Sequence, residues 1–225
     1  MGKTKDIFVN DDGTCTFIFK DDACGEDGVF NPGANEVGLK IEGKGRASML
    51  LSQHFFPILA GRGIQTHYIS TDVDRGTMMC MKLNILPIEF IWRDKAWGSF
   101  CKMYGVEQGL PLNGLIEATV KDDALGDPRI NREAAVLLGK ITDAQYEQCD
   151  GYTRKIGSIL KEELAQYGYS LIDFKVEFGV DTEGTIRLAD EVSGDIWRVL
   201  DKDGNSVDPI ACANEICGNV AMSEA

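Results

Sequence analysis

The segment 172–178 alternates apolar and ionisable residues without interruption, and it constrains the fold more than any other part of the sequence. Every second residue from 172 to 178 is Ile, Phe or Val, and the residues between them are Asp173, Lys175 and Glu177. Side chains alternate between the two faces of a β-strand, so this segment predicts a strand with one apolar and one ionisable face. A second strand over 185–192 follows the turn Asp181-Thr182-Glu183-Gly184. The two strands therefore form a hairpin.

The register of this hairpin decides which ionisable groups meet. If Asp181 pairs with Gly184, then Asp190 lies opposite Lys175 on the ionisable face. Glu177 and Asp190 can then ligate a magnesium ion, while Lys175 neutralises charge on a transferring phosphoryl group. An amphipathic hairpin with a solvated polar face has the same pattern, and the pattern alone slightly favours that plainer interpretation.

Strand and loop signals dominate the N-terminal part of the chain. Segments 6–9 and 14–19 flank the turn Asn10-Asp11-Asp12-Gly13, which predicts an opening hairpin. Segment 21–44 is polar and rich in glycine, and its length is typical of a functional loop. Further strands are expected over 66–69, 77–83 and 87–92.

Two helices are indicated by apolar spacing and by end signals. Residues 47–59 have helical spacing, although Pro57 should kink or shorten the helix. Thr142 and Gln145 form a capping-box signature, and Gly168 marks the end of a long helix that packs across a sheet.

Composition restricts the classes of partner. The 225 residues carry a net charge of −13, which disfavours nucleic acid but allows a small phosphorylated substrate in a locally basic cleft. The N-terminus is polar and no segment is apolar enough to span a membrane, so a cytoplasmic location is expected. Seven cysteines without a Cys-x-x-Cys pair indicate reduced thiols, and two histidines make a histidine-rich metal site improbable.

Several motifs resemble those of one enzyme family, the SAICAR synthetases. The run from Leu171 to Gly179, LIDFKVEFG, resembles the family's D-x-K-x-E-F-G segment, and Leu188-Ala189-Asp190-Glu191 resembles its G-D-E segment. The resemblance extends from the N-terminus to about residue 200. Other pieces match in the same order: Gly2-Lys3-Thr4-Lys5, Gly43-Lys44-Gly45, Arg93 with Ala96 and Gly98-Ser99, and Lys121-Asp122-Asp123 with Asp127-Pro128.

The resemblance implies a two-lobed α+β fold with antiparallel sheets and a nucleotide cleft, related in layout to ATP-grasp enzymes and protein kinases. Residues 1–86 would form the lobe that covers the nucleotide, and residues 87–225 the lobe that carries the substrate and metal residues. Members of the family are ATP- and Mg²⁺-dependent ligases of purine biosynthesis. It joins the carboxylate of 5-amino-1-(5-phosphoribosyl)imidazole-4-carboxylate to the amine of L-aspartate through an acyl phosphate, giving SAICAR, ADP and phosphate.

The resemblance also assigns roles to individual residues. Lys175 and Asp173 are the implied catalytic residues, and Glu177 and Asp190 the implied metal ligands. A solvated basic terminus remains the alternative for the N-terminal lysines, and surface ion pairs remain the alternative for the two arginines. The implied nucleotide contacts are Lys3, Thr4, Lys5, Lys82, Lys121, Lys175 and Glu177, and the implied substrate contacts are Asp27, Gly28, Lys44, Arg93, Ser99, Asp173 and Arg198.

Four departures from the family pattern bear on the acceptor substrate. Gly194 stands where the family has a proline, and Trp97 stands where it has a smaller residue. The stretch 29–42 is longer than usual, and the tail 201–225 is short and weakly patterned. Two alternatives therefore stay open: a diverged ligase that uses a different carboxylate or amine, and a catalytically silent ATP-binding protein. A homo-oligomer is compatible with the resemblance.

Overall fold

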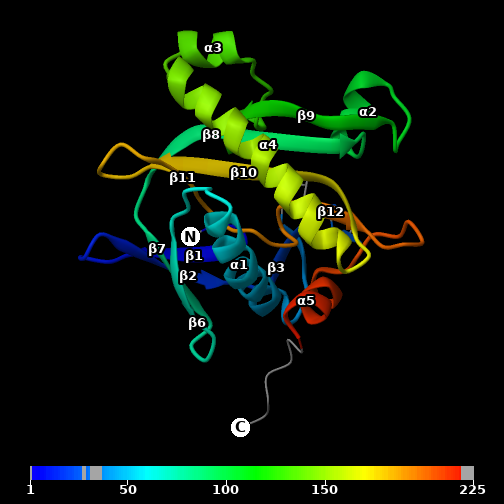
Figure 1. The fold of residues 1–225 in the computed structure, drawn as a ribbon, viewed down its shortest axis with the longest axis horizontal. Helices are drawn as coiled ribbons and strands as arrows, with labels where there is room; N and C mark the ends of the chain where they lie inside the picture. Colours follow the sequence, from blue (N-terminus) through cyan, green and yellow to red (C-terminus); the bar gives the residue numbers. More distant parts are fainter. Residues whose placement is uncertain (1, 27–28, 31–36, 219–225) are drawn as a thin grey trace.

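Two antiparallel sheets form the frame of the protein, one built before residue 82 and the other after residue 83 (Figure 1). The structure, a computed structural model, describes residues 2–26, 29–30 and 37–218. Helices α1 (Lys44–Gly61) and α4 (Asp143–Ala165) cover the two sheets, so the described part of the chain has the expected α+β architecture.

The first sheet has the strand order β1-β2-β7-β6. Its first pair is the predicted opening hairpin, with Phe8 opposite Thr16. The segment expected to be a long loop instead contains a small three-stranded sheet with the order β4-β3-β5, so that expectation was wrong for its described part. The bounds are β1 Lys5–Val9, β2 Thr14–Phe19, β3 Asp22–Glu26, β4 Val29–Phe30, β5 Val37–Lys40, β6 Tyr68–Asp72 and β7 Thr77–Met81.

Helix α1 runs through Pro57 and continues to Gly61, so the expected shortening was wrong. Pro57 is exposed, and the carbonyl group that loses its helical partner can be hydrated there. Phe55, Phe56 and Leu59 are fully buried around it. Their packing stabilises the last turn against the effect of the proline.

The second sheet has the order β11-β10-β8-β9. Strands β11 and β12 share one edge of β10: β11 pairs with its C-terminal end and β12 with its N-terminal end. The predicted hairpin of β10 and β11 is confirmed, but its register was wrong by one residue because Gly179 pairs with Arg187. The second strand also ends at Leu188, which leaves Asp190 outside the ladder. The bounds are β8 Asn84–Lys95, β9 Pro111–Val120, β10 Ser170–Val180, β11 Ile186–Leu188 and β12 Trp197–Leu200.

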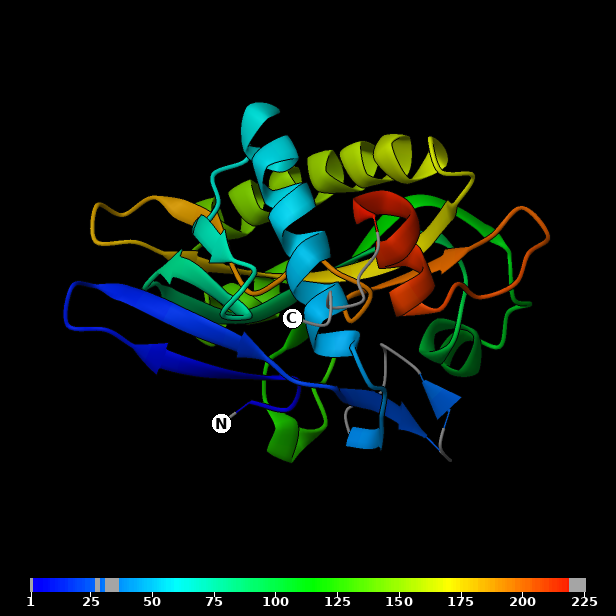
Figure 2. The same cartoon turned by 90° about the horizontal axis from the view of Figure 1, so that it is seen from below.

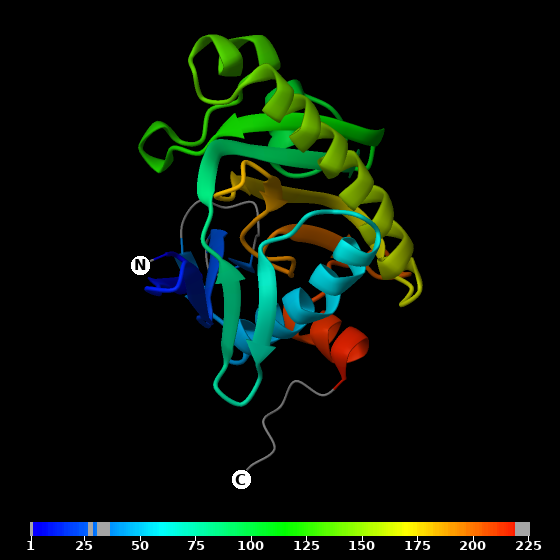
Figure 3. The ribbon, with the colours of Figure 1, turned by 60° about the vertical axis from the view of Figure 1, so that its left-hand side comes forward.

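The apolar face of the second sheet packs under α4 (Figure 3). Thr142 and Gln145 cap this helix reciprocally, as the sequence predicts. Gly157 lies directly over Trp92 of β8, and a Cβ atom there would approach the indole ring to 2.5 Å. The opposite face of the sheet carries the ionisable residues, because directly paired residues share a face.

A short helix, α5 (Pro209–Cys217), lies beside α1 (Figure 2). It was missed in the tail thought to be weakly patterned, although Asp208 caps it and Pro209 occupies its first turn. The remaining helices are α2 Ser99–Tyr104, the 3₁₀ turn η1 Asp123–Leu125 and α3 Arg132–Leu137.

One hydrophobic cluster connects the two sheets, and it includes Phe17 and Phe55 together with Phe174 and Trp197. The division into lobes 1–86 and 87–225 stays a prediction, and the described core is continuous across it. Within the described residues, no helix has the length and apolar character needed to cross a membrane.

Candidate active site

The ionisable face of the second sheet lines a cavity of about 290 Å³. Five of the residues assigned from the sequence contribute to its wall, namely Arg93, Ser99, Asp173, Lys175 and Arg198. They come from β8, the start of α2, β10 and β12. The fold thus brings together residues separated by up to about a hundred positions in the chain.

Asp173 is held between two arginines at one end of this cavity. Arg93 Nη1 donates to Asp173 Oδ2 at 2.6 Å, and Arg198 Nη1 donates to the same oxygen at 2.8 Å. Arg93 Nε also donates to Glu117 Oε2 at 2.6 Å. Burial raises the pKa of Asp173, although both arginines oppose that effect. Arg93 is only 3% exposed, so the alternative of a surface ion pair was wrong for it.

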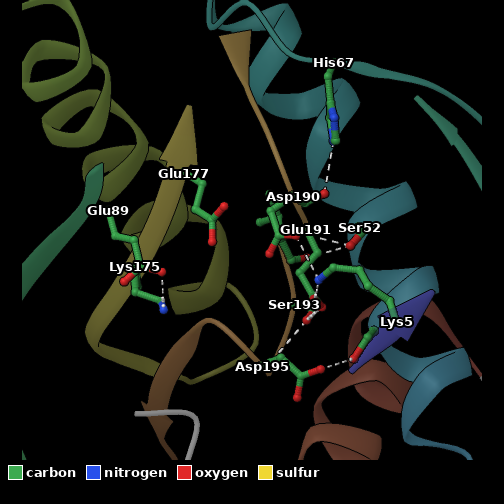
Figure 4. Close-up of polar contacts among 12 residues, drawn as sticks. Lys5, Ser52, His67, Glu89, Lys175, Glu177, Asp190, Glu191, Ser193 and Asp195 are labelled. Carbon is green, nitrogen blue, oxygen red and sulfur yellow. Dashed lines mark hydrogen bonds and ion pairs between the residues drawn. The ribbon is translucent and has the colours of Figure 1, made fainter. Parts of the chain in front are cut away.

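Lys175 forms an ion pair with Glu89, a residue that sequence reasoning did not single out. Lys175 Nζ donates to Glu89 Oε1 at 2.8 Å (Figure 4). The hydroxyl of Thr119 donates to Glu89 Oε2 at 3.1 Å. Burial lowers the pKa of Lys175, but the charge and hydrogen bond of Glu89 act together with the charges of Glu177 and Asp190, and the net shift is upward. Lys175 is therefore a protonated cation at neutral pH.

Glu177 and Asp190 lie close enough to affect each other's ionisation. Figure 4 shows the Glu177 carboxylate on the β10 side and Asp190 on the chain that follows β11. Burial and then the charge of Asp190 raise the pKa of Glu177 to about 6, while Lys121 binds its carboxylate and opposes the rise. Asp190 adopts a left-handed backbone with φ of 66°, which is uncommon for a residue other than glycine.

Lys5 binds both Asp190 and Glu191. Its Nζ lies 2.9 Å from Asp190 Oδ1 and donates to Glu191. Burial would raise the pKa of Asp190, but the charge and hydrogen bond of Lys5 act together with the charge of Lys121, and the net pKa is lowered. His67 Nε2 donates to the backbone carbonyl of Asp190 at 3.0 Å. Lys5 is only 7% exposed, so a solvated basic terminus was the wrong interpretation for this residue.

Lys44 is fully buried at the first turn of α1, where it binds Asp195. Ser48 Oγ donates to the same Asp195 oxygen at 3.3 Å. Ser193 links the Glu191 carboxylate to the backbone of Asp195, since its hydroxyl donates to Glu191 and accepts from the Asp195 backbone N–H at 3.1 Å. A chain of polar contacts thus connects β1, the loop after β11 and α1 (Figure 4).

The other predicted site residues are less enclosed. Lys3 and Lys82 are exposed, and Thr4 is half-buried. Asp27 and Gly28 lie outside the described residues.

The carboxylates of the site suit a hard divalent cation only if a bound nucleotide supplies further oxygen ligands. Among the residues that the structure describes, no three His, Cys, Asp or Glu side chains converge as a metal cluster. Glu177 and Asp190 supply a carboxylate pair, and Mg²⁺ is commonly bound by one or two carboxylates together with nucleotide phosphates and water. The pair therefore fits magnesium that arrives with a nucleotide.

Comparison with known proteins places this chain in a family. The model of the SAICAR synthetase family matches residues 1–210. The chain belongs to that family. The phosphoribosylaminoimidazole-succinocarboxamide synthase of Clostridium tetani is 43% identical over 214 residues, which cover 93% of this chain and 94% of that protein. The enzyme of the same name from Streptococcus pyogenes is 40% identical over 209 residues, covering 92% and 86% of the two chains.

Solved structures of SAICAR synthetases have the same fold. One, a SAICAR synthetase in complex with ADP, superposes with a TM-score of 0.86 at 33% identity and covers 97% of both chains. The enzyme from Ehrlichia chaffeensis superposes with a TM-score of 0.83 at 30% identity, covering 92% of this chain and 86% of that one. The two-layered α+β architecture is therefore the SAICAR synthetase fold.

Helix α5 explains why glycine suits position 194 of this SAICAR synthetase. A Cβ atom on Gly194 would lie 2.8 Å from the Cβ of Pro209, which is closer than real Cβ atoms approach. Pro209 begins α5, so a larger residue in the loop would displace that helix. The departure from the family pattern is thus matched by the packing of the C-terminal helix.

Proposed function

We propose that this chain is an ATP-dependent amide-forming ligase that makes SAICAR, ADP and phosphate from the imidazole ribotide carboxylate and L-aspartate. The observation that carries the proposal is the position of Lys175. It lines the cavity that contains the arginine pair, and it is within electrostatic reach of the carboxylates Glu177 and Asp190. A cation between an acceptor site and a nucleotide site suits phosphoryl transfer.

The ribotide phosphate binds at the arginine end of the cavity in this proposal. Arg93, Arg198 and Ser99 hold it, and guanidinium groups suit the task because they bond phosphate bidentately. Asp173, fixed by both arginines, contacts the imidazole ring of the ribotide. Lys44 supports the loop 189–196 through its ion pair with Asp195.

The carboxylate end of the ribotide then lies toward Lys175. The carboxylate oxygen attacks the γ-phosphorus of ATP, the bond to the ADP oxygen breaks, and an acyl phosphate forms. The amine of aspartate next attacks the acyl carbon, phosphate leaves, and the amine loses its proton. Lys175 stabilises the charge that moves with the phosphoryl group, and Glu89 holds its ammonium in place.

The nucleotide contacts come from the first sheet and from the edge of the second. The nucleotide phosphates are surrounded by Lys3, Thr4, Lys82 and Lys121. Lys5 holds the Asp190 carboxylate in place through their ion pair. When bound, magnesium on Glu177 and Asp190 would supply Lewis-acid neutralisation of the phosphate charge. A cytoplasmic location, a homo-oligomeric state and the lack of a nucleic-acid or membrane partner remain predictions.

A coupled assay of ADP release tests the proposed function. Purified protein is supplied with Mg-ATP, the imidazole ribotide carboxylate and L-aspartate, and the product is identified by mass. We expect ADP release that needs both acceptor substrates and a product with the mass of SAICAR. ADP release with a different carboxylate or amine, or ATP binding without turnover, would contradict the assignment of these substrates.

A further inference from the structure

A second cavity, of about 280 Å³, adjoins the candidate active site. It shares Trp197 and Arg198 with the first cavity, whereas Lys175 and Glu89 line the first one only. Its walls come from β4, the turn before α2, β12 and the start of α5. Apart from Arg198, no residue of these walls has a role in the proposed reaction.

The lining of this second cavity is selective. Phe30, Trp97 and Trp197 contribute aromatic rings, and Arg198 is the one charged residue in the described lining. Gln108 and Ser206 add an amide and a hydroxyl group. Aromatic walls favour a flat ring system, and a guanidinium ion favours an anionic group on that ring.

Arg198 stands between the two cavities. Its Nη1 donates to Asp173 on the side of the first cavity, at 3.0 Å to Oδ1 and 2.8 Å to Oδ2. Its Nη2 lies against the backbone of Gly98, where a Cβ atom would approach it to 3.2 Å. Gly98 has a φ of 53°, so glycine suits this turn for its backbone as well as for the close approach. An anion in the second cavity would therefore use the guanidinium that the proposed function assigns to the ribotide phosphate.

We propose that the second cavity binds a small planar aromatic monoanion of one or two rings, and that this ligand competes with the ribotide for Arg198. The volume is at the lower limit for ligand pockets, which sets the size of the ring system. Trp97 and Gly194, two positions where the sequence departs from the family pattern, both line this cavity. Binding of the compound does not depend on the proposed function, whereas its competition with the ribotide rests on that function.

Calorimetry with indole-3-carboxylate tests the binding site directly. We expect a dissociation constant on the order of 0.1–1 mM, which is ordinary for a fragment of this size. The neutral, isosteric indole-3-carboxamide should bind at least about tenfold more weakly, because it lacks the charge that pairs with Arg198. Equal binding of the two compounds, or no binding of either, would overturn the proposed site.

Two variants locate the compound. Val207→Phe puts a ring into the cavity and should abolish binding of the carboxylate, while ADP release without the compound stays unchanged. Phe8→Ala truncates an aromatic side chain that is 53% exposed on the first sheet, and it should leave binding intact. Undiminished binding to the Val207→Phe variant, in a protein with normal thermal unfolding, would place the compound elsewhere and refute the proposal.

Steady-state kinetics test the competition. At a compound concentration equal to its dissociation constant, the apparent KM for the ribotide should rise about twofold, while the KM for ATP stays constant. Binding by calorimetry with no change in either KM would overturn the shared use of Arg198. A protein that binds the compound but forms no SAICAR would instead contradict the proposed function and leave the site in place.

Discussion

The carboxylates of Glu177 and Asp190 are balanced by Lys121 and Lys5 in the described structure. Glu177→Gln and Asp190→Asn each remove one negative charge with little change in volume, so each variant should fold normally. We expect turnover to fall on the order of 100-fold or more, because each change removes a ligand from the proposed metal site. Steady-state rates over a magnesium titration provide the measurement, and unchanged turnover at saturating magnesium in both variants would contradict the assignment.

Arg198 should distinguish the ribotide from ATP. Arg198→Lys keeps the charge but replaces a planar fork with a point charge, so one charge-assisted hydrogen bond of about 1.5–3 kcal/mol is lost. The apparent KM for the ribotide should rise about 10- to 100-fold, and the KM for ATP should change little. Equal increases in both KM values would mean that the arginine serves the structure rather than the phosphate.

Lys175 requires a design that avoids leaving its partner Glu89 as a lone buried charge. In a Glu89→Gln background, Lys175→Met removes the ammonium while no unpaired carboxylate remains. We expect single-turnover acyl-phosphate formation to fall about a thousandfold relative to Glu89→Gln alone, with ATP affinity changed much less. If ATP bound weakly while acyl phosphate still formed at a near-normal rate, Lys175 would bind ATP in the ground state and would not stabilise the transition state.

Sequence reasoning found most of the polar residues on β10 but few of their partners. The alternation over 172–178 identified Asp173, Lys175 and Glu177 because they are every second residue of one strand. In β8 the period of two also puts Glu89 on the face of Arg93, but Ile91 between them breaks the alternation, so the signal for Glu89 was weaker. Asp195 gave no such signal, because its partner Lys44 is 151 positions away and only the tertiary fold joins them.

At the scale of elements, α4 contains two glycines in opposite environments. Gly157 is buried against Trp92, whereas Gly151 is exposed and no atom lies within 4 Å of a Cβ built there. Gly157→Ala should destabilise the protein by about 1–3 kcal/mol, because the added methyl group overpacks the interface with the sheet. Gly151→Ala should stabilise it by up to about 1 kcal/mol, because alanine is the better helix former.

Denaturant unfolding of both α4 variants provides the comparison. If both substitutions changed the free energy of unfolding equally, α4 would not pack on Trp92 as closely as the structure shows. Loss of ADP release in the Gly151→Ala variant would be equally unexpected, since this exposed residue does not line the cavity.

Elements with strong end signals were predicted, and those held mainly by pairing were not. The capping box of α4 and the turn of the β10–β11 hairpin are local signals, so the sequence alone located them. Strand β12 has four residues and exists through its pairing with β10. Strands β3 to β5 are similarly short, and their glycine-rich composition concealed them. Helix α5 did carry a local signal in Asp208-Pro209, and it was overlooked.

For the whole molecule, the continuous core predicts a single unfolding transition. Trp197 of β12 packs edge-to-face on Phe55 of α1, with ring centroids 5.2 Å apart, so it connects the two predicted lobes. Thermal unfolding followed by tryptophan fluorescence and by far-UV circular dichroism should give the same midpoint. Two separated transitions would indicate that the lobes fold independently.

The ion pair between Lys5 and Glu191 joins residues 186 positions apart. A ribosome that adds about 5–20 residues per second needs about 10–40 s to make that stretch of chain. During that time the opening hairpin has already emerged, but its lysine has no carboxylate to meet. A nascent or prematurely terminated chain that lacks Glu191 therefore cannot form this ion pair, and the proposed nucleotide site is incomplete in it.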